Sequence, residues 1–187
     1  MRYIITLILS TILITSLKAQ NDATKQFIRS AVKFKHIVYV DSAGIDVEEM
    51  RAVLDKDTIH TLMTNDPIFV ITKEERTYIN KELDAMRAFV WEKDLIDSSM
   101  LVKGRVLNKI FSNKKRKLPK SWGYFHTHYG DGYFFFSKPI FIRNNTYCIF
   151  RSAYYCDWSL CGNGYIDIYK NINGKWVAWY PLKAWQF

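Results

Sequence analysis

The sequence predicts an α+β fold in which N-terminal helices pack on a C-terminal antiparallel β-meander of about five strands. Up to residue 112, apolar residues recur at helical spacing. From residue 122 onward, aromatic and β-branched runs are separated by hairpin dipeptides. Hydrophobic residues make up 49% of the chain, which is enough for a sizeable core and argues against disorder. Helices and strands that are segregated along the chain are typical of the α+β class.

Residues 1–19 have the features of a secretory signal peptide. Arg2 supplies a positive charge, Ile4–Ile14 is an apolar run, and Ala19 supplies a small residue at the cleavage site. The apolar run is shorter than the ~20 residues that a membrane-spanning helix needs. We therefore expect the peptide to be cleaved, with no transmembrane segment afterwards. The expected product is an exported protein, either periplasmic or extracellular.

The expected mature chain, residues 20–187, has the length of a single domain. It divides into a helix-rich half, 20–112, and a sheet, 122–187. Residues 20–100 contain 11 basic and 15 acidic residues, a net charge of −4, whereas the rest of the chain contains 14 basic and 3 acidic residues, a net charge of +11. Two interpretations stay open. Either a basic C-terminal surface attracts anions, or the two halves pack together and partly neutralise each other.

Four elements and one well-defined helix are expected in the first half. In order, the pattern predicts helix Asp22–Lys33, strand Phe34–Val40, helix Asp46–Asp55 and strand Pro67–Ile71. The best-defined helix follows Thr72, which forms a capping box with Glu75. Its expected buried stripe is Ile79, Leu83, Met86 and Val90. Met100–Phe111, with Gly104 inside it, is compatible with either helix or strand.

Turn dipeptides divide the second half into strands. The five expected strands are Trp122–Tyr129, Tyr133–Ile142, Thr146–Cys156, Tyr165–Lys170 and Lys175–Pro181. If Asn144-Asn145 is a two-residue turn, Lys138 lies directly opposite Arg151. Like charges in that position destabilise a strand pair, so we expect a negative group nearby.

Two candidates exist for that negative group. One is a carboxylate from the helices, such as Glu82 or Asp84, which would form a structural ion pair. The other is an anionic ligand, with aromatic side chains as its neighbours. The candidate ligand-binding residues are Lys138, Arg151, Trp122, Tyr155 and Trp158.

The three cysteines predict one disulfide. Cys148 and Cys156 lie on one extended strand, roughly 27 Å apart, so they cannot bond to each other. Cys156 and Cys161 flank a tight corner and are predicted to form the disulfide. Cys148 is then expected to be a buried, inert thiol.

His126 and His128 are the candidate metal ligands of the sequence. With Ser137, they resemble the metal-binding pattern of JAMM-type metalloproteases, but Ile140 stands where the third ligand, an aspartate, is required. A zinc ion shared with Cys156 and Cys161 is excluded by the expected register, which separates Cys156 from His128 by about 12 Å. We predict no metal and no cofactor.

Three segments, FSKPIF (136–141), SLCGNGYIDIYK (159–170) and NGKW (173–176), resemble an uncharacterised group of small secreted bacterial proteins. The resemblance covers roughly the last third of the chain. It implies export and a C-terminal sheet, but no activity, substrate or catalytic residue.

The sequence predicts a non-catalytic binding module for an anionic or protein partner, such as an anionic glycan, an envelope lipid or another protein. Nucleic acid is not expected, because the basic run 113–120 follows a signal peptide. One alternative is a secreted hydrolase whose site is assembled from residues distant in sequence. Another is a periplasmic immunity-type protein that neutralises another protein. The two carboxylates that glycoside hydrolysis requires are not evident in the sheet half.

Overall fold

The structure is a computed structural model that describes residues 22–44, 46–56, 58–59, 69–93, 95–112, 117–157 and 161–186. The expected signal peptide and Trp158 lie outside these residues. The described elements, in chain order, are a helix at residues 22–31, β1 (Val38–Val40), α2 (Val47–Leu54), β2 (Thr58–Ile59), β3 (Phe69–Val70), α3 (Lys73–Met86), β4 (Met100–Val102), α4 (Gly104–Phe111), α5 (Leu118–His128), β5 (Tyr133–Phe136), β6 (Ile140–Ile142), β7 (Tyr147–Tyr155), β8 (Asn163–Ile172) and β9 (Lys175–Gln186).

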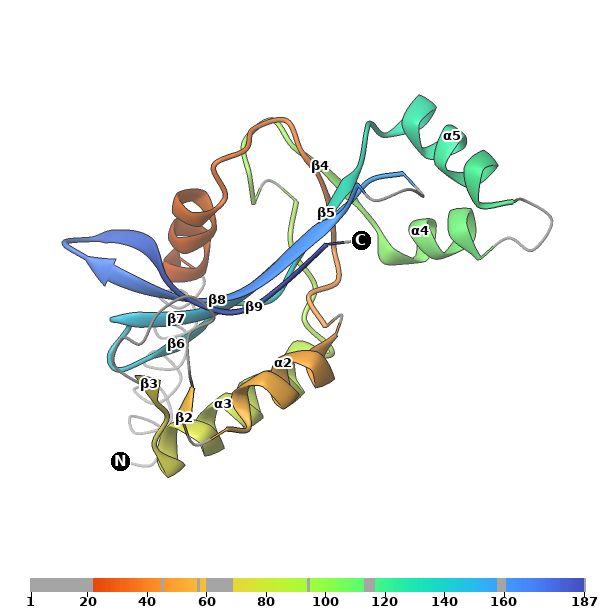
Figure 1. Ribbon diagram of the computed structural model, residues 1–187. Helices are drawn as coiled ribbons and strands as arrows, with labels where there is room; N and C mark the ends of the chain where they lie inside the picture. Colours follow the sequence, from red (N-terminus) through yellow and green to blue (C-terminus); the bar gives the residue numbers. More distant parts are fainter. Residues whose placement is uncertain are drawn as a thin grey trace, which may run out of the picture.

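A mixed seven-stranded sheet forms the centre of the fold (Figure 1). Its order is β4-β1-β5-β7-β8-β9, and β6 pairs with β7 beside β5. The α+β class is confirmed. The expected antiparallel sheet of about five strands describes only part of the observed sheet. Strand β1 pairs in parallel with both β4 and β5, so two strands from the helix-rich half extend the sheet. Parallel pairing is possible here because long, helix-containing connections separate these strands.

The expected strand Trp122–Tyr129 is wrong, because these residues belong mostly to helix α5. Pro119 lies in the first turn of α5, where its missing N–H leaves no intrahelical bond unmade. Trp122 and Phe125, three residues apart, are both buried, and Phe125 stacks on Tyr129 one turn later. This is helical spacing, which the density of aromatic residues concealed.

The expected strand Tyr133–Ile142 is two strands, β5 and β6, separated by residues 137–139. Proline at position 139 lacks the N–H that a continuous ladder would need. Strand β6 pairs with β7 in the expected register, but β5 is shifted by one residue, so Phe135 lies opposite Ala153. The backbone N–H of Arg151 donates to the Ser137 hydroxyl at 2.8 Å. Lys138 therefore does not lie directly opposite Arg151, and that prediction is wrong.

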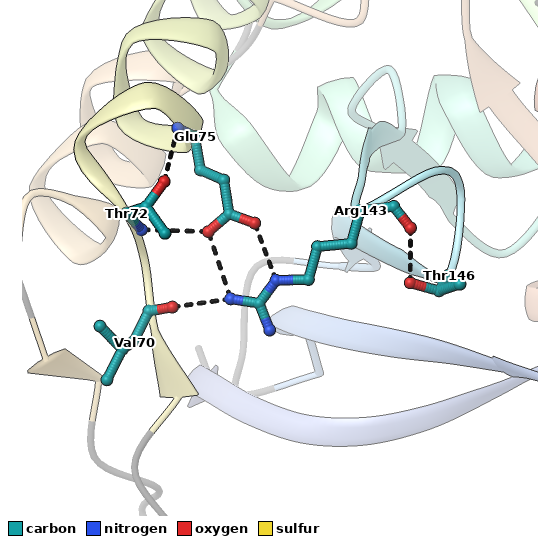
Figure 2. Close-up of polar contacts among 5 residues, drawn as sticks. All are labelled: Val70, Thr72, Glu75, Arg143 and Thr146. Atoms are coloured by element: carbon teal, nitrogen blue, oxygen red, sulfur yellow. Dashed lines mark hydrogen bonds and ion pairs between the residues drawn. The ribbon is translucent and has the colours of Figure 1, made fainter.

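Helix α3 begins as predicted. The Glu75 N–H donates to the Thr72 hydroxyl at 3.2 Å, and the Thr72 N–H donates to the Glu75 carboxylate at 3.0 Å, which confirms the capping box. Figure 2 shows that Arg143, from the β6–β7 turn, contacts the same carboxylate through two nitrogens and the Val70 carbonyl at 2.7 Å. This bond to Arg143 lowers the pKa of Glu75. The contact fastens the turn to the start of α3.

The remaining helices agree with the sequence except at their ends. Residues Val47, Met50 and Leu54 form the buried side of α2, as expected. The stripe of α3 ends at Met86, so Val90 lies beyond the helix and is 60% exposed. The segment Met100–Phe111, which was compatible with either helix or strand, contains both a strand and a helix, because β4 is followed by α4.

The sheet has two faces, which we name after two adjacent residues of β7. On the Arg151 face, the Arg151 guanidinium contacts α2, while farther along the sheet Tyr133 packs with α4 and α5. Figure 1 shows the α2–α3 pair and the α4–α5 pair well apart. On the Phe150 face, Phe27 of the 22–31 helix packs edge-on against Phe150, with ring centroids 5.0 Å apart. Helices thus cover both faces, and each covers only part of its face.

Candidate functional site

A cleft of about 730 Å³ lies at the carboxyl ends of the parallel strands β1 and β4. We call it the carboxyl-edge cleft. In α/β sheets, the carboxyl ends of parallel strands are the usual position of ligand sites, and the volume is within the range of small-molecule pockets. Its polar lining side chains are those of Asp41, Ser42, Lys103, Arg105 and Asn108, and Gly104 also lines it.

Backbone and side-chain hydrogen bonds hold the base of the cleft together. Asp41 directly follows β1, and its carboxylate accepts from the Gly104 N–H, the first residue of α4, at 2.8 Å. The Asp41 N–H donates to the Val102 carbonyl at 3.1 Å, and its own carbonyl accepts from the Trp91 N–H at 2.7 Å. Three chain segments distant in sequence are therefore joined at one residue.

The charged groups of the cleft are mainly basic. Lys103 precedes α4 and Arg105 is in its first turn; both are exposed. Among the described residues, neither has an ion-pair partner. The first turn of α4 contains no acidic residue, so the positive end of the helix dipole adds to their charge. Asp41 is the one carboxylate among the described lining residues, and Gly104 already occupies one of its oxygens.

The remaining wall of the cleft is apolar. Its apolar residues are Val90, Trp91, Leu101, Leu107 and Phe135. Trp91 is buried, and its indole N–H donates to the Phe136 carbonyl at 2.9 Å, so its ring is held in place. Val90 is largely exposed. A cleft with two cations and an apolar wall suits a ligand that has an anionic group and an apolar part.

The candidate ligand-binding residues from the sequence do not form one site. Lys138 pairs with Glu82 at 2.9 Å, and both side chains are largely buried. Arg151, which is 2% exposed, pairs with Asp46 at 2.5 Å and with Glu49 at 3.4 Å. The carboxylate expected near Lys138 is thus Glu82, one of the two residues considered. Both cations have partners within the protein.

The aromatic candidates lie in a different part of the molecule. Trp122 is buried and stacks on Tyr133, with ring centroids 5.7 Å apart. Tyr155 stacks on the other side of this cluster, 5.5 Å from the Tyr133 ring. Trp122 and Tyr155 are therefore brought together as members of the core under α4 and α5. Trp158 lies outside the described residues.

The cysteine predictions are confirmed. Cys156 and Cys161 form a disulfide with Cα atoms 5.4 Å apart, and Cys148 is a buried free thiol. Burial raises the pKa of the Cys148 thiol well above its usual value, which makes it unreactive. His126 and His128 lie on helix α5, so the strand register that was used to separate them from Cys156 does not apply.

Sequence reasoning missed the cleft, although part of its signal was present. Asp41-Ser42 follows the run that became β1, and Lys103-Gly104 follows the run that became β4. Polar residues directly after buried strands are typical of α/β ligand sites. The signal could be used only once β1 and β4 were known to be parallel neighbours.

Comparison with protein-family models, with curated proteins and with solved structures finds no match to this chain.

Proposed function

We propose that this chain is an exported binding protein that holds a small organic anion in the carboxyl-edge cleft. The observation that carries the proposal is the combination of two cations without ion-pair partners, Lys103 and Arg105, and an apolar wall around Trp91 in one cleft. A carboxylate or phosphate group would be held by the cations and by the amide end of α4. The carbon skeleton would pack against the wall.

Binding is favoured over hydrolysis by the state of Asp41. General acid–base hydrolysis needs a side chain that is free to exchange protons with the substrate, and Asp41 is the one carboxylate among the described lining residues. Asp41 instead accepts a hydrogen bond from Gly104 that joins β1 to α4. The hydrolase and immunity-type alternatives remain predictions from the sequence.

Export is supported by one further observation. The Cys156–Cys161 disulfide is typical of an oxidising compartment. In the part of the chain that the structure describes, no helix is long and apolar enough to cross a membrane. The expected mature N-terminus is Gln20, and the intact mass of the exported protein tests it. A mass that includes residues 1–19 would contradict cleavage.

Calorimetry with phenyl phosphate, benzoate and inorganic phosphate tests the cleft. We expect phenyl phosphate to bind more tightly than inorganic phosphate, because only the former contacts the apolar wall. Replacing Lys103 and Arg105 with glutamine should weaken phenyl phosphate binding by about tenfold or more, since each charge-assisted hydrogen bond contributes roughly 1.5–3 kcal/mol. It should also reduce the dependence of affinity on salt.

A matched control makes the same change in net charge elsewhere. Lys109 and Lys120 are exposed residues of α4 and α5 outside the lining. Replacing both with glutamine should leave affinity within about twofold, because exposed charges at a distance contribute little. Equal loss in both double variants, or no binding of any of the three anions to the unaltered protein, would refute the proposal.

A further inference from the structure

A second surface, on the Phe150 face, has a different chemical character from the cleft. Strand β8 alternates strictly: Gly164, Ile166 and Ile168 are buried, whereas the residues between them are exposed or half-buried. The 22–31 helix covers this face where Phe27 packs on Phe150 and Tyr169, and the segment after α3 covers it at Tyr39. Beside these contacts the face is open around Tyr165, which is exposed. The open part, which we call the tyrosine face, consists of Ser152, Tyr154, Asn163, Tyr165, Asp167 and Gln186.

Several aromatic rings lie on this part of the sheet. Tyr165 is 43% exposed. The Tyr154 ring lies 4.6 Å from the Phe134 ring, and the Phe134 ring stacks on Phe34 at 5.7 Å. Phe34 is itself 62% exposed. Exposed rings held by neighbouring rings offer flat apolar surfaces that lose little side-chain entropy on binding.

Planar polar groups border these rings. A hollow of about 370 Å³ is lined by Asn163, Tyr165, Gln186 and their neighbours on β9. Asn163 pairs across the strands with Tyr154 on one side and Gln186 on the other. Side-chain amides both donate and accept hydrogen bonds. The hollow therefore offers both kinds of partner beside an exposed ring.

The charge of the tyrosine face is opposite to that of the C-terminal half as a whole. Its six residues include one carboxylate, Asp167, and no lysine or arginine. In the described part of the chain, the Asp167 carboxylate has no hydrogen-bond or ion-pair partner. Burial raises its pKa to about 6. A half-buried carboxylate without a partner destabilises the fold when it is ionised, and such a group is typical of sites where a ligand supplies the partner.

We propose that the tyrosine face binds an uncharged, hydroxyl-rich chain, namely a neutral glycan. The apolar C–H faces of sugar rings would stack on Tyr165 and Tyr154, and hydroxyl groups would bond to the amides of Asn163 and Gln186 and to the carboxylate of Asp167. The face contains no cation that would attract an anionic polymer. This site is separate from the carboxyl-edge cleft in position and in ligand chemistry.

Two neutral probes and one anionic probe test the proposal by calorimetry: the β-1,4-linked tetramers of glucose and of N-acetylglucosamine, and tetragalacturonate. We expect at least one neutral tetramer to bind and tetragalacturonate to bind more weakly. Tyr165→Ala should weaken binding of the neutral tetramer by about tenfold or more, as expected for loss of a stacked ring at the centre of a site. The matched control is Tyr78→Ala, an exposed tyrosine on α3, which should bind as the unaltered protein does.

The variant Asp167→Asn provides a second test, because its expected result differs from that of a residue with a purely structural role. We expect this variant to be more stable at neutral pH, because a half-buried charge without a partner is removed, and yet to bind the neutral tetramer more weakly. The Lys103 and Arg105 double variant should bind the tetramer normally, which separates this site from the proposed function of the cleft. The proposal is overturned if neither neutral tetramer binds, if tetragalacturonate binds best, or if Tyr165→Ala and Asp167→Asn both bind normally.

Discussion

Two groups of cations within residues 101–187 differ in what surrounds them. Four cations on the sheet and its turns pair with carboxylates from the first half of the chain: Lys138 with Glu82, Arg143 with Glu75, Arg151 with Asp46 and Glu49, and Lys183 with Glu49. Those at the carboxyl-edge cleft, Lys103 and Arg105, have no such partner in the described residues.

This difference bears on the two interpretations of the charge asymmetry. Among the described residues, the ion pairs between the two parts of the chain lie where α2 and α3 contact the sheet. At the cleft, the cations are left without carboxylate partners, and net charge can attract a ligand. Total charge therefore says less about binding than the positions at which the two halves leave charges unpaired.

The largest expected difference between the two groups concerns stability. Arg151→Met should lower the free energy of unfolding by about 2 kcal/mol, because the buried guanidinium loses its ion pairs with Asp46 and Glu49. Replacing Lys103 and Arg105 with glutamine should change it by less than about 0.5 kcal/mol. Urea denaturation measures both. Similar losses would show that the two groups of cations are not distinct.

A double-mutant cycle on Lys138 and Glu82 tests the same comparison, with an expected energetic effect of intermediate size. Both side chains are largely buried, with exposures of 16% and 15%. We expect a coupling energy of about 1–2 kcal/mol, larger than that of an exposed pair. The same cycle on the exposed pair Arg29–Asp97 is the control. Equal coupling energies would mean that burial does not strengthen these pairs.

The contribution of Asp167 to stability should change with pH in the direction opposite to that of an ion-paired carboxylate such as Glu75. Its pKa is about 6 in the folded protein and about 3.8 when unfolded, so its favourable contribution is fully present below pH 3.8 and is lost as pH rises through 6. Solvent reaches part of the carboxylate, so we expect Asp167→Asn to be more stable by about 1 kcal/mol at pH 8. The two proteins should converge at pH 3.5. Tyr169 and Cys148, which lie on the same face, have raised pKa values and stay neutral over this range. Constant stability differences across pH would contradict this prediction.

The smallest expected effect concerns Glu75. Arg143 lowers the pKa of Glu75 below its usual 4.5, so this pair stabilises the fold above that pH and less as pH falls through the folded value. Glu75→Gln keeps the capping box but removes the charge. It should lower the free energy of unfolding by about 0.5 kcal/mol at pH 7. The difference should shrink as pH falls below 4.5, as thermal unfolding can show.

The sequence by itself determined the local features of this protein. The capping box of α3, the buried side of α2 and the Cys156–Cys161 disulfide each depend on residues within a few positions of one another. Such features are set by hydrogen bonds and packing inside one element, which spacing reveals. The same spacing was present in α5, where Trp122 and Phe125 share a side, but a run of aromatic residues is equally common in strands.

Only the tertiary structure decided the features that join distant segments. Strands β1 and β4 have three residues each, and nothing local states that they lie side by side in parallel. The shift of β5 by one residue, which places Ser137 opposite Arg151, arises at a break before Pro139 that also turns the Lys138 side chain toward Glu82. Which cations are paired, and therefore which of them remain without a carboxylate partner at the cleft, depends on the packing of elements far apart in the chain. Pairing across a sheet and burial of charge depend on contacts between residues distant in sequence, so residue spacing alone does not predict them.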